Sequence, residues 1–175
     1  MAAPIRSASL PAVLDAPSTD IKLETLTGHT HTLAEWLVVF NLMGVVIDPY
    51  THQSGWILPT ASRLFLVYEE ADVRCAFVVC SDAQGARSFL GRFADEHLVL
   101  LDPEREFVRS LGLERLPALV HLAQDASVLG AAQGWNAGEW SDVIDGVEEA
   151  MDWRARPVLP TADDPGNFEG TPALG

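Results

Sequence analysis

The sequence predicts a single α/β domain in which a central β-sheet is covered by helices on both faces. Residues 37–40 and 73–80 are almost entirely apolar, as in strands that are buried on both sides. Segments with apolar residues at helical spacing alternate with such runs. The chain has 175 residues, of which 48% are hydrophobic and 21% charged, so it is long enough for one core but short for two domains.

The N-terminal elements have clear local signals. Residues 21–26 alternate between apolar and polar as a half-buried strand does, and Gly28 follows in a turn. Thr32 and Glu35 have the spacing of a capping box at the start of a short helix. We expect residues 37–40 to form the first central strand. A long loop should then cover residues 44–58, and long loops inside compact domains are often functional.

The middle of the chain repeats helices and strands in alternation. The predicted order is a helix at 59–70, a strand at 73–80, a helix that includes 86–93, a strand at 98–101 and a helix at 102–112. Pro59 suits the first turn of its helix, and Asp82 suits an N-cap. Gly112 is a typical residue for ending the last of these helices.

The C-terminal part predicts a hairpin followed by the clearest helix. Strands at 118–122 and 128–133 are separated by a polar turn. Asn136 and Glu139 then form a capping pair for a helix with an apolar face and an acidic outer face. We therefore expect an irregular arm at residues 1–19, a folded domain at 20–153 and a flexible, Pro/Gly-rich tail at 154–175.

This order of elements resembles the thioredoxin-like fold, in the form found in the peroxiredoxin/redoxin (AhpC/TSA-like) family. The likeness extends from about residue 21 to residue 153, and its motifs are Gly28 with the segments 33–40, 77–82, 100–103, 111–113 and 116–120. The resemblance implies a central mixed sheet flanked by helices on both faces. It also implies a cis-proline at Pro117. Redoxins react through a cysteine at the start of the helix that follows the first central strand.

The cysteines of this chain depart from that pattern. Residues 41–56, which correspond to the reactive segment, contain no cysteine. Cys75 and Cys80 lie in one predicted strand, and their odd separation places them on opposite faces, where they cannot bond to each other. Buried core cysteines are the simpler interpretation of both. The alternative is a thiol-dependent oxidoreductase or peroxidase that uses Cys80, which ends its strand just before a helix.

We therefore expect a non-catalytic redoxin-type protein that acts as a binding, chaperone-like or scaffold module. The resemblance and the aromatic loop together suggest six binding residues: Asp48, Tyr50, His52, Trp56, Leu116 and Pro117. Trp56 is equally open to interpretation as a contact residue or as an anchor of its own loop. No cofactor and no metal site is predicted, because nothing in the spacing fixes His29, His31 and His52 around Asp48 as ligands.

Charge and hydropathy restrict the partners. Lys and Arg number 11 against 25 for Asp and Glu, giving a formal net charge of -14, which argues against nucleic acid and anionic membrane surfaces. A protein partner is expected, with a basic partner as an open alternative. The low cysteine count, the lack of a convincing signal peptide and the absence of a 20-residue apolar stretch predict a cytoplasmic protein with no membrane span. The oligomeric state cannot be predicted from these features.

Overall fold

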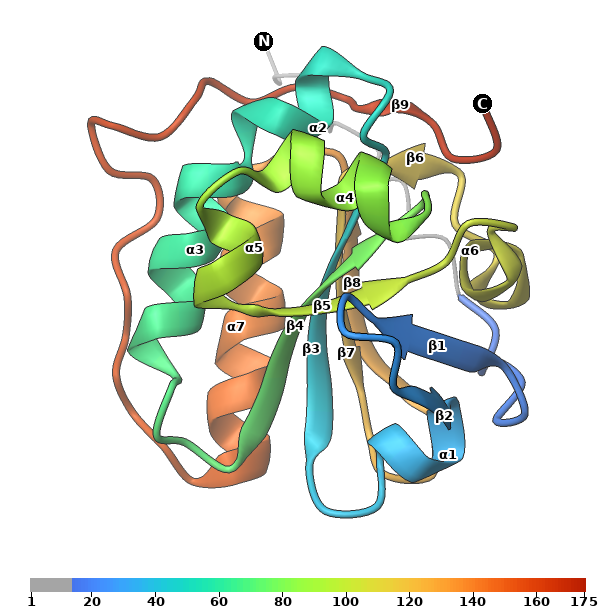
Figure 1. Ribbon diagram of the computed structural model, residues 1–175. Helices are drawn as coiled ribbons and strands as arrows, with labels where there is room; N and C mark the ends of the chain where they lie inside the picture. The colour runs from blue at the N-terminus through green and yellow to red at the C-terminus, as the bar shows by residue number, and fades with distance from the viewer. Residues whose placement is uncertain (1–13) are drawn as a thin grey trace, which may run out of the picture.

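A computed structural model describes residues 14–175, so most of the irregular arm expected at 1–19 lies outside the described residues. The strands are β1 (Lys22–Thr25), β2 (Thr30–Thr32), β3 (Asn41–Ile47), β4 (Val73–Val79), β5 (Leu98–Leu101), β6 (Arg115–Leu116), β7 (Ala118–Leu122), β8 (Val128–Gln133) and β9 (Thr171–Pro172). Within residues 14–175, seven of them form one mixed sheet in the order β2-β1-β5-β4-β3-β7-β8 (Figure 1). The central strands β3, β4 and β5 run parallel, and β7 is antiparallel to β3.

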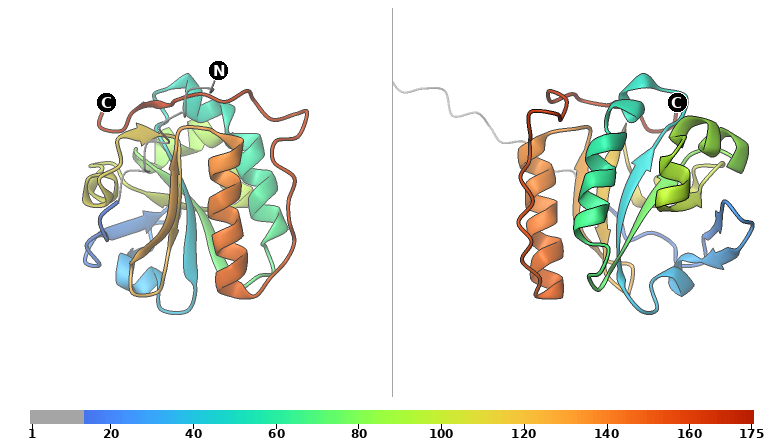
Figure 2. Two further views of the ribbon diagram at one scale, coloured as in Figure 1. Left: turned by 180° about the vertical axis from the view of Figure 1, so that it is seen from behind. Right: turned by 60° about the vertical axis from the view of Figure 1, so that its left-hand side comes forward.

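Helices cover both faces of this sheet, as predicted. They are α1 (Leu33–Trp36), α2 (His52–Trp56), α3 (Leu58–Val67), α4 (Ala83–Leu90), α5 (Phe93–Glu96), α6 (Glu106–Leu111) and α7 (Ala137–Met151). The apolar residues of α3 and α7 pack on one face, where the two helices lie side by side (Figure 2). Those of α1 and α6 pack on the other. Alternate residues of β3 point into the two cores: Met43 and Val45 into the first, Leu42 and Val46 into the second.

Several local predictions are confirmed. The Thr32 hydroxyl accepts a hydrogen bond from the Glu35 amide, and the Glu35 carboxylate accepts one from the Thr32 amide, so the capping box of α1 is complete. The side chains of Asp82 and Asn136 cap α4 and α7. Gly112 ends α6 with a φ of 75°.

The first central strand is an exception, because it lies at Asn41–Ile47 and not at residues 37–40. Val38 and Val39 are 69% and 59% exposed in the turn that leads into the strand. Gly44, expected at the start of a loop, lies inside β3. A Cβ there would lie 3.4 Å from a Val120 methyl on the neighbouring strand, which is an ordinary van der Waals distance.

Two further boundaries differ from the expectation. The segment expected to be a loop at 44–58 contains the end of β3 and the short helix α2, with irregular turns at 48–51 and at residue 57. Helix α6 begins at Glu106, not at Asp102, because Asp102–Arg105 forms a turn first. Pro59 does lie in the first turn of α3, as predicted.

The C-terminal segment lies against the domain, in contrast to the flexible tail that its composition suggested. It runs back along α7 and α3 and then crosses the sheet at the end where the central strands terminate (Figure 1). Phe168 pairs with Trp135, and β9 pairs with β6 in a second, two-stranded sheet. Ala173 is consequently 2% exposed. No helix within residues 14–175 is long and apolar enough to cross a membrane.

Candidate functional site at the carboxyl edge of the sheet

Polar residues gather where the three parallel strands end. Asp48, Cys80 and Asp102 are the first residues after β3, β4 and β5, whose last residues are paired in register across the sheet. All three are at most 3% exposed. In open α/β sheets, ligands bind at the carboxyl ends of the strands, which makes this edge the candidate site.

Arg105 connects this edge to the C-terminal segment. One guanidinium nitrogen, Nη2, donates to Asp48 Oδ2 at 2.9 Å, and the other, Nη1, donates to the carbonyl oxygen of Ala173 at 2.5 Å. The side chains of Arg105 and Asp48 are only 16% and 3% exposed, so this ion pair is largely shielded from water. Arg105 also has a φ of 55°, a left-handed conformation that costs a non-glycine residue about 1 kcal/mol or more.

Asp102 is paired with backbone amides of α6. Its carboxylate accepts hydrogen bonds from the amides of Phe107 at 3.2 Å and Val108 at 3.3 Å, so it caps the first turn of α6. Burial raises the pKa of Asp102, and the hydrogen bonds from these amides oppose that effect. The sequence predicts Asp102 only as the start of a helix, although its position directly after a buried strand also indicates a place at the carboxyl edge of the sheet.

The thiol of Cys80 is beside this cluster but is poorly suited to react. Burial raises the pKa of Cys80 to about 12, the nearby carboxylates add to this, and Arg105 opposes it. Burial also raises the pKa of Cys75 to about 12. The two thiols point into opposite cores, as the odd spacing predicted. Both are therefore protonated at neutral pH, whereas the thiolate is the reactive form.

The segment after β3 is organised around Asp48. The Asp48 amide donates to the Ser54 hydroxyl at 3.0 Å, and its carboxylate Oδ1 accepts from the Tyr50 amide at 2.9 Å. These bonds fix a tight turn that leaves two aromatic side chains outside. Tyr50 is 74% exposed and Trp56 is 53% exposed.

Trp56 lies between the body of the protein and solvent. Its indole lies edge-to-face against Phe168 of the C-terminal segment, with 5.4 Å between ring centroids, so it contacts the body of the protein. It still presents about half of its surface to solvent, beside the exposed His52.

The six predicted binding residues thus separate into two groups. Tyr50, His52 and Trp56 lie on the surface, whereas Asp48 is buried in the ion pair with Arg105. Leu116 and Pro117 are also buried, and the peptide bond between them is cis, as the resemblance implied. The edge formed by Leu116 is covered by β9.

The histidines weighed as metal ligands do not come together. His31 lies 3.5 Å from the Glu35 carboxylate, whereas Asp48 pairs with Arg105. Among residues 14–175, no group of three or more His, Cys, Asp or Glu side chains is arranged to hold a metal ion. His121 is fully buried in β7, where its Nε2 lies 3.1 Å from the Asn41 side-chain nitrogen and burial lowers its pKa to about 4.

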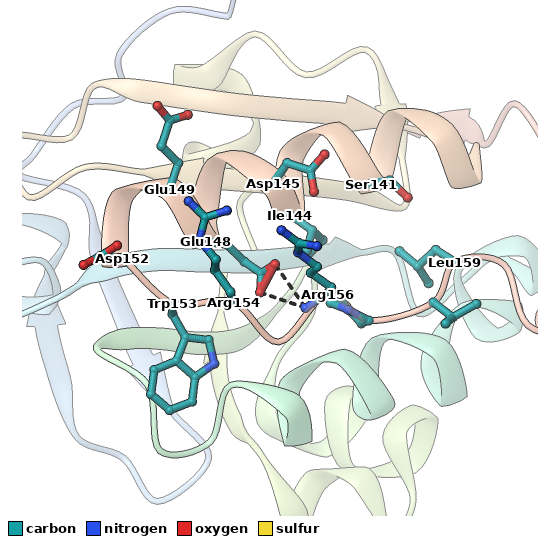
Figure 3. A pocket seen from close by; sticks show the side chains of 12 residues that line it. Ser141, Ile144, Asp145, Glu148, Glu149, Asp152, Trp153, Arg154, Arg156 and Leu159 are labelled. Atoms are coloured by element: carbon teal, nitrogen blue, oxygen red, sulfur yellow. Dashed lines mark hydrogen bonds between the residues drawn. The ribbon is translucent and has the colours of Figure 1, made fainter.

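A hollow of about 800 Å³ lies away from this cluster, between α7 and the first residues of the C-terminal segment (Figure 3). Its floor holds Glu148, whose carboxylate accepts hydrogen bonds from the amides of Ala155 at 2.6 Å and Arg156 at 3.1 Å. Asp145 and Glu149 line it from α7. These hydrogen bonds attach the start of the C-terminal segment to α7.

Comparison with known proteins supports the fold. No protein-family model matches the sequence, and no curated protein matches it either. Among solved structures, a secreted disulfide oxidoreductase of Mycobacterium tuberculosis, homologous to E. coli DsbE, aligns with a TM-score of 0.59 at 16% identity, covering 76% of this chain and 97% of that one.

Two further structures agree. Peroxiredoxin Q of Xanthomonas campestris aligns with a TM-score of 0.62 at 13% identity over 78% of this chain and 94% of its own. A thioredoxin-like protein of Porphyromonas gingivalis aligns with a TM-score of 0.58 at 17% identity over 79% and 94%. The mixed sheet, the helices on both faces and these alignments together establish that the chain has a thioredoxin-like α/β fold, the fold of the redoxins that its sequence resembles.

Proposed function

We propose that this protein is a non-catalytic thioredoxin-like binding module whose contact surface is formed by Tyr50, His52 and Trp56. One observation carries the proposal. The segment that joins β3 to α3 contains no cysteine and instead displays two large aromatic side chains, 74% and 53% exposed. Exposed tyrosine and tryptophan are enriched among the residues that contribute most to protein interfaces.

The proposed partner is another protein. The formal net charge of -14 would accelerate the approach of a basic partner and repel acidic polymers, so a basic protein is the favoured class. Because the expected compartment is reducing, we place this interaction in the cytoplasm.

A second candidate function is thiol chemistry at Cys80. Two of the structures that share the fold are named as a disulfide oxidoreductase and a peroxiredoxin, and Cys80 lies within the polar cluster at the strand ends. Against it, Cys80 is 2% exposed, and its pKa of about 12 instead of 9.0 reduces the thiolate population at neutral pH by roughly a thousandfold.

Alkylation separates the two candidates. Cys75→Ser and Cys80→Ser each leave one thiol, and the rate of iodoacetamide labelling between pH 6 and pH 9 is followed by mass spectrometry. We expect both variants to react far more slowly than free cysteine until the protein is denatured. Rapid labelling of Cys80 in the Cys75→Ser variant below neutral pH would establish the thiol candidate instead.

A matched pair of variants tests the contact surface. Trp56→Ala and Val39→Ala each remove an exposed apolar side chain, 53% and 59% exposed, at opposite ends of β3. Proteins retained by the immobilised wild type are identified by mass spectrometry and compared with those retained by each variant. The proposal predicts that Trp56→Ala loses the retained protein at least tenfold while Val39→Ala keeps it. Equal retention by both variants would exclude this surface.

A further inference from the structure

The hollow of about 800 Å³ between α7 and the start of the C-terminal segment has walls of opposite charge. Arg154 and Arg156 belong to the segment, and Figure 3 shows both side chains pointing toward α7. Asp145 and Glu149 lie on the α7 wall, four residues apart and therefore on one face of the helix. The hollow has the size of a small-molecule site, for which about 300–1,000 Å³ is typical.

The two arginines of this hollow are not neutralised by the acidic residues near them. The ion pairs within residues 14–175 involve His31, Arg63 and Arg105. Neither Arg154 nor Arg156 takes part in an ion pair within that range. Two guanidinium groups that point in the same direction offer several N–H donors at once, which is the arrangement that binds a carboxylate or phosphate group.

Glu148 fixes the backbone from which these arginines project. It is 6% exposed, and its carboxylate accepts hydrogen bonds from the amides of Ala155 and Arg156. Its charge is therefore used within the chain and is not offered to a ligand. Arg156 also has a φ of 50°, a left-handed conformation that is costly for a residue with a side chain. Such conformations persist only where the surrounding structure holds them, and they cluster at functional sites, which supports a site at this position.

The charges on the two walls restrict the class of ligand. A purely anionic molecule would be repelled by the carboxylates of Asp145, Glu149 and Asp152, and a purely cationic one would be repelled by the two arginines. A zwitterion satisfies both walls, and a free α-amino acid carries both a carboxylate and an ammonium group at neutral pH. Trp153, which is 42% exposed, and Val158 line the same hollow and can contact an apolar side chain.

We propose that this hollow binds a free amino acid with an apolar side chain. The carboxylate of the ligand pairs with Arg154 and Arg156, and its ammonium group pairs with Asp145 and Glu149. None of the residues that line the hollow belongs to the proposed contact surface for a protein partner. The inference therefore adds a small-molecule ligand to the binding module and holds whether or not that surface binds a protein.

Calorimetric titration of the full chain at about pH 6 tests the class of ligand. L-phenylalanine carries both charges at this pH, N-acetyl-L-phenylalanine keeps only the carboxylate, and L-phenylalaninamide keeps only the ammonium group. We expect L-phenylalanine to bind at least tenfold more tightly than either analogue and than inorganic phosphate. No binding of L-phenylalanine, or binding of an analogue or of phosphate with equal or higher affinity, would overturn the inference.

Two double variants assign the walls. Arg154→Gln/Arg156→Gln should bind L-phenylalanine and L-phenylalaninamide alike, because the carboxylate has lost its partners. Asp145→Asn/Glu149→Gln should bind L-phenylalanine and N-acetyl-L-phenylalanine alike, because the ammonium group has lost its partners. Asp142→Asn is the control, since it removes a charge of α7 outside the hollow and should keep the tenfold preference. All five side chains are exposed, so each variant should unfold at the Tm of the wild type. A double variant that still prefers L-phenylalanine over the analogue named for it would contradict the assignment of that wall.

Discussion

Replacing Asp48 by asparagine should destabilise the protein through the charge that it leaves behind. The Asp48 carboxylate bonds to Arg105 Nη2 at 2.9 Å and to the Tyr50 amide at 2.9 Å. An asparagine side chain can keep the oxygen that faces Tyr50, but its NH₂ group then faces the guanidinium, donor against donor. Arg105 would remain mostly buried with no counter-charge.

The magnitude follows from the burial of the pair. Breaking a fully buried ion pair by removing one partner costs about 3–5 kcal/mol. Because the Arg105 side chain is 16% exposed and can move toward solvent, we expect about 2–3 kcal/mol for Asp48→Asn. For a chain of 175 residues this corresponds to a decrease in Tm of about 5–10 °C.

Urea unfolding followed by tryptophan fluorescence measures this loss. Asp163→Asn, at an exposed position, is the control and should change the free energy of unfolding by less than about 0.5 kcal/mol. Arg105→Met in the Asp48→Asn background removes the unpaired charge, so the double-mutant cycle should give a coupling energy of about 1–2 kcal/mol. Additive single effects, or an Asp48→Asn variant as stable as the control, would refute the assignment of this pair.

Three further predictions concern stability. Burial lowers the pKa of His121 from 6.5 to about 4. Between pH 7 and pH 4 the unfolded chain therefore binds a proton at this residue that the folded chain does not bind. The free energy of unfolding should fall by about 3 kcal/mol over this range. His121→Gln should flatten this dependence in urea titrations at several pH values, and an unchanged slope would contradict the assignment. Asn136→Ala should cost about 1 kcal/mol, measured by thermal denaturation, because it removes the N-cap of α7, and no change in Tm would argue against that cap. Val46→Ala should lower the free energy of unfolding by about 2 kcal/mol and Val39→Ala by less than about 0.5 kcal/mol. Equal losses in urea unfolding would favour a central strand at residues 37–40.

The features predicted well from the sequence are those that a few adjacent residues determine. The capping box of Thr32 and Glu35, the N-cap at Asn136 and the left-handed glycine at 112 each depend on one turn of chain. β3 depends on more. Its residues are buried on both faces and show no periodicity, so nothing local distinguishes them from the exposed Val38 and Val39 just before them.

The candidate site could be predicted only in part, for the same reason. Asp48 was identified, but its partner Arg105 is 57 residues away and comes to it through the order of strands in the sheet. The course of the C-terminal segment was also hidden, because glycine and proline are typical both of flexible tails and of close backbone contacts. Gly134 and Gly170 are glycines of close backbone contact, because a Cβ at either would collide with backbone atoms.

The polar side chains at the strand ends already have hydrogen-bond partners within the protein, so the proposed contact surface lies outside this cluster. Asp102 is satisfied by two amides of α6, and Asp48 by Arg105 and the Tyr50 amide. Arg105 in turn divides its donors between Asp48 and the carbonyl of Ala173. These polar groups are therefore paired within the chain, whereas Tyr50 and Trp56 are exposed and can supply apolar contact area to the proposed partner.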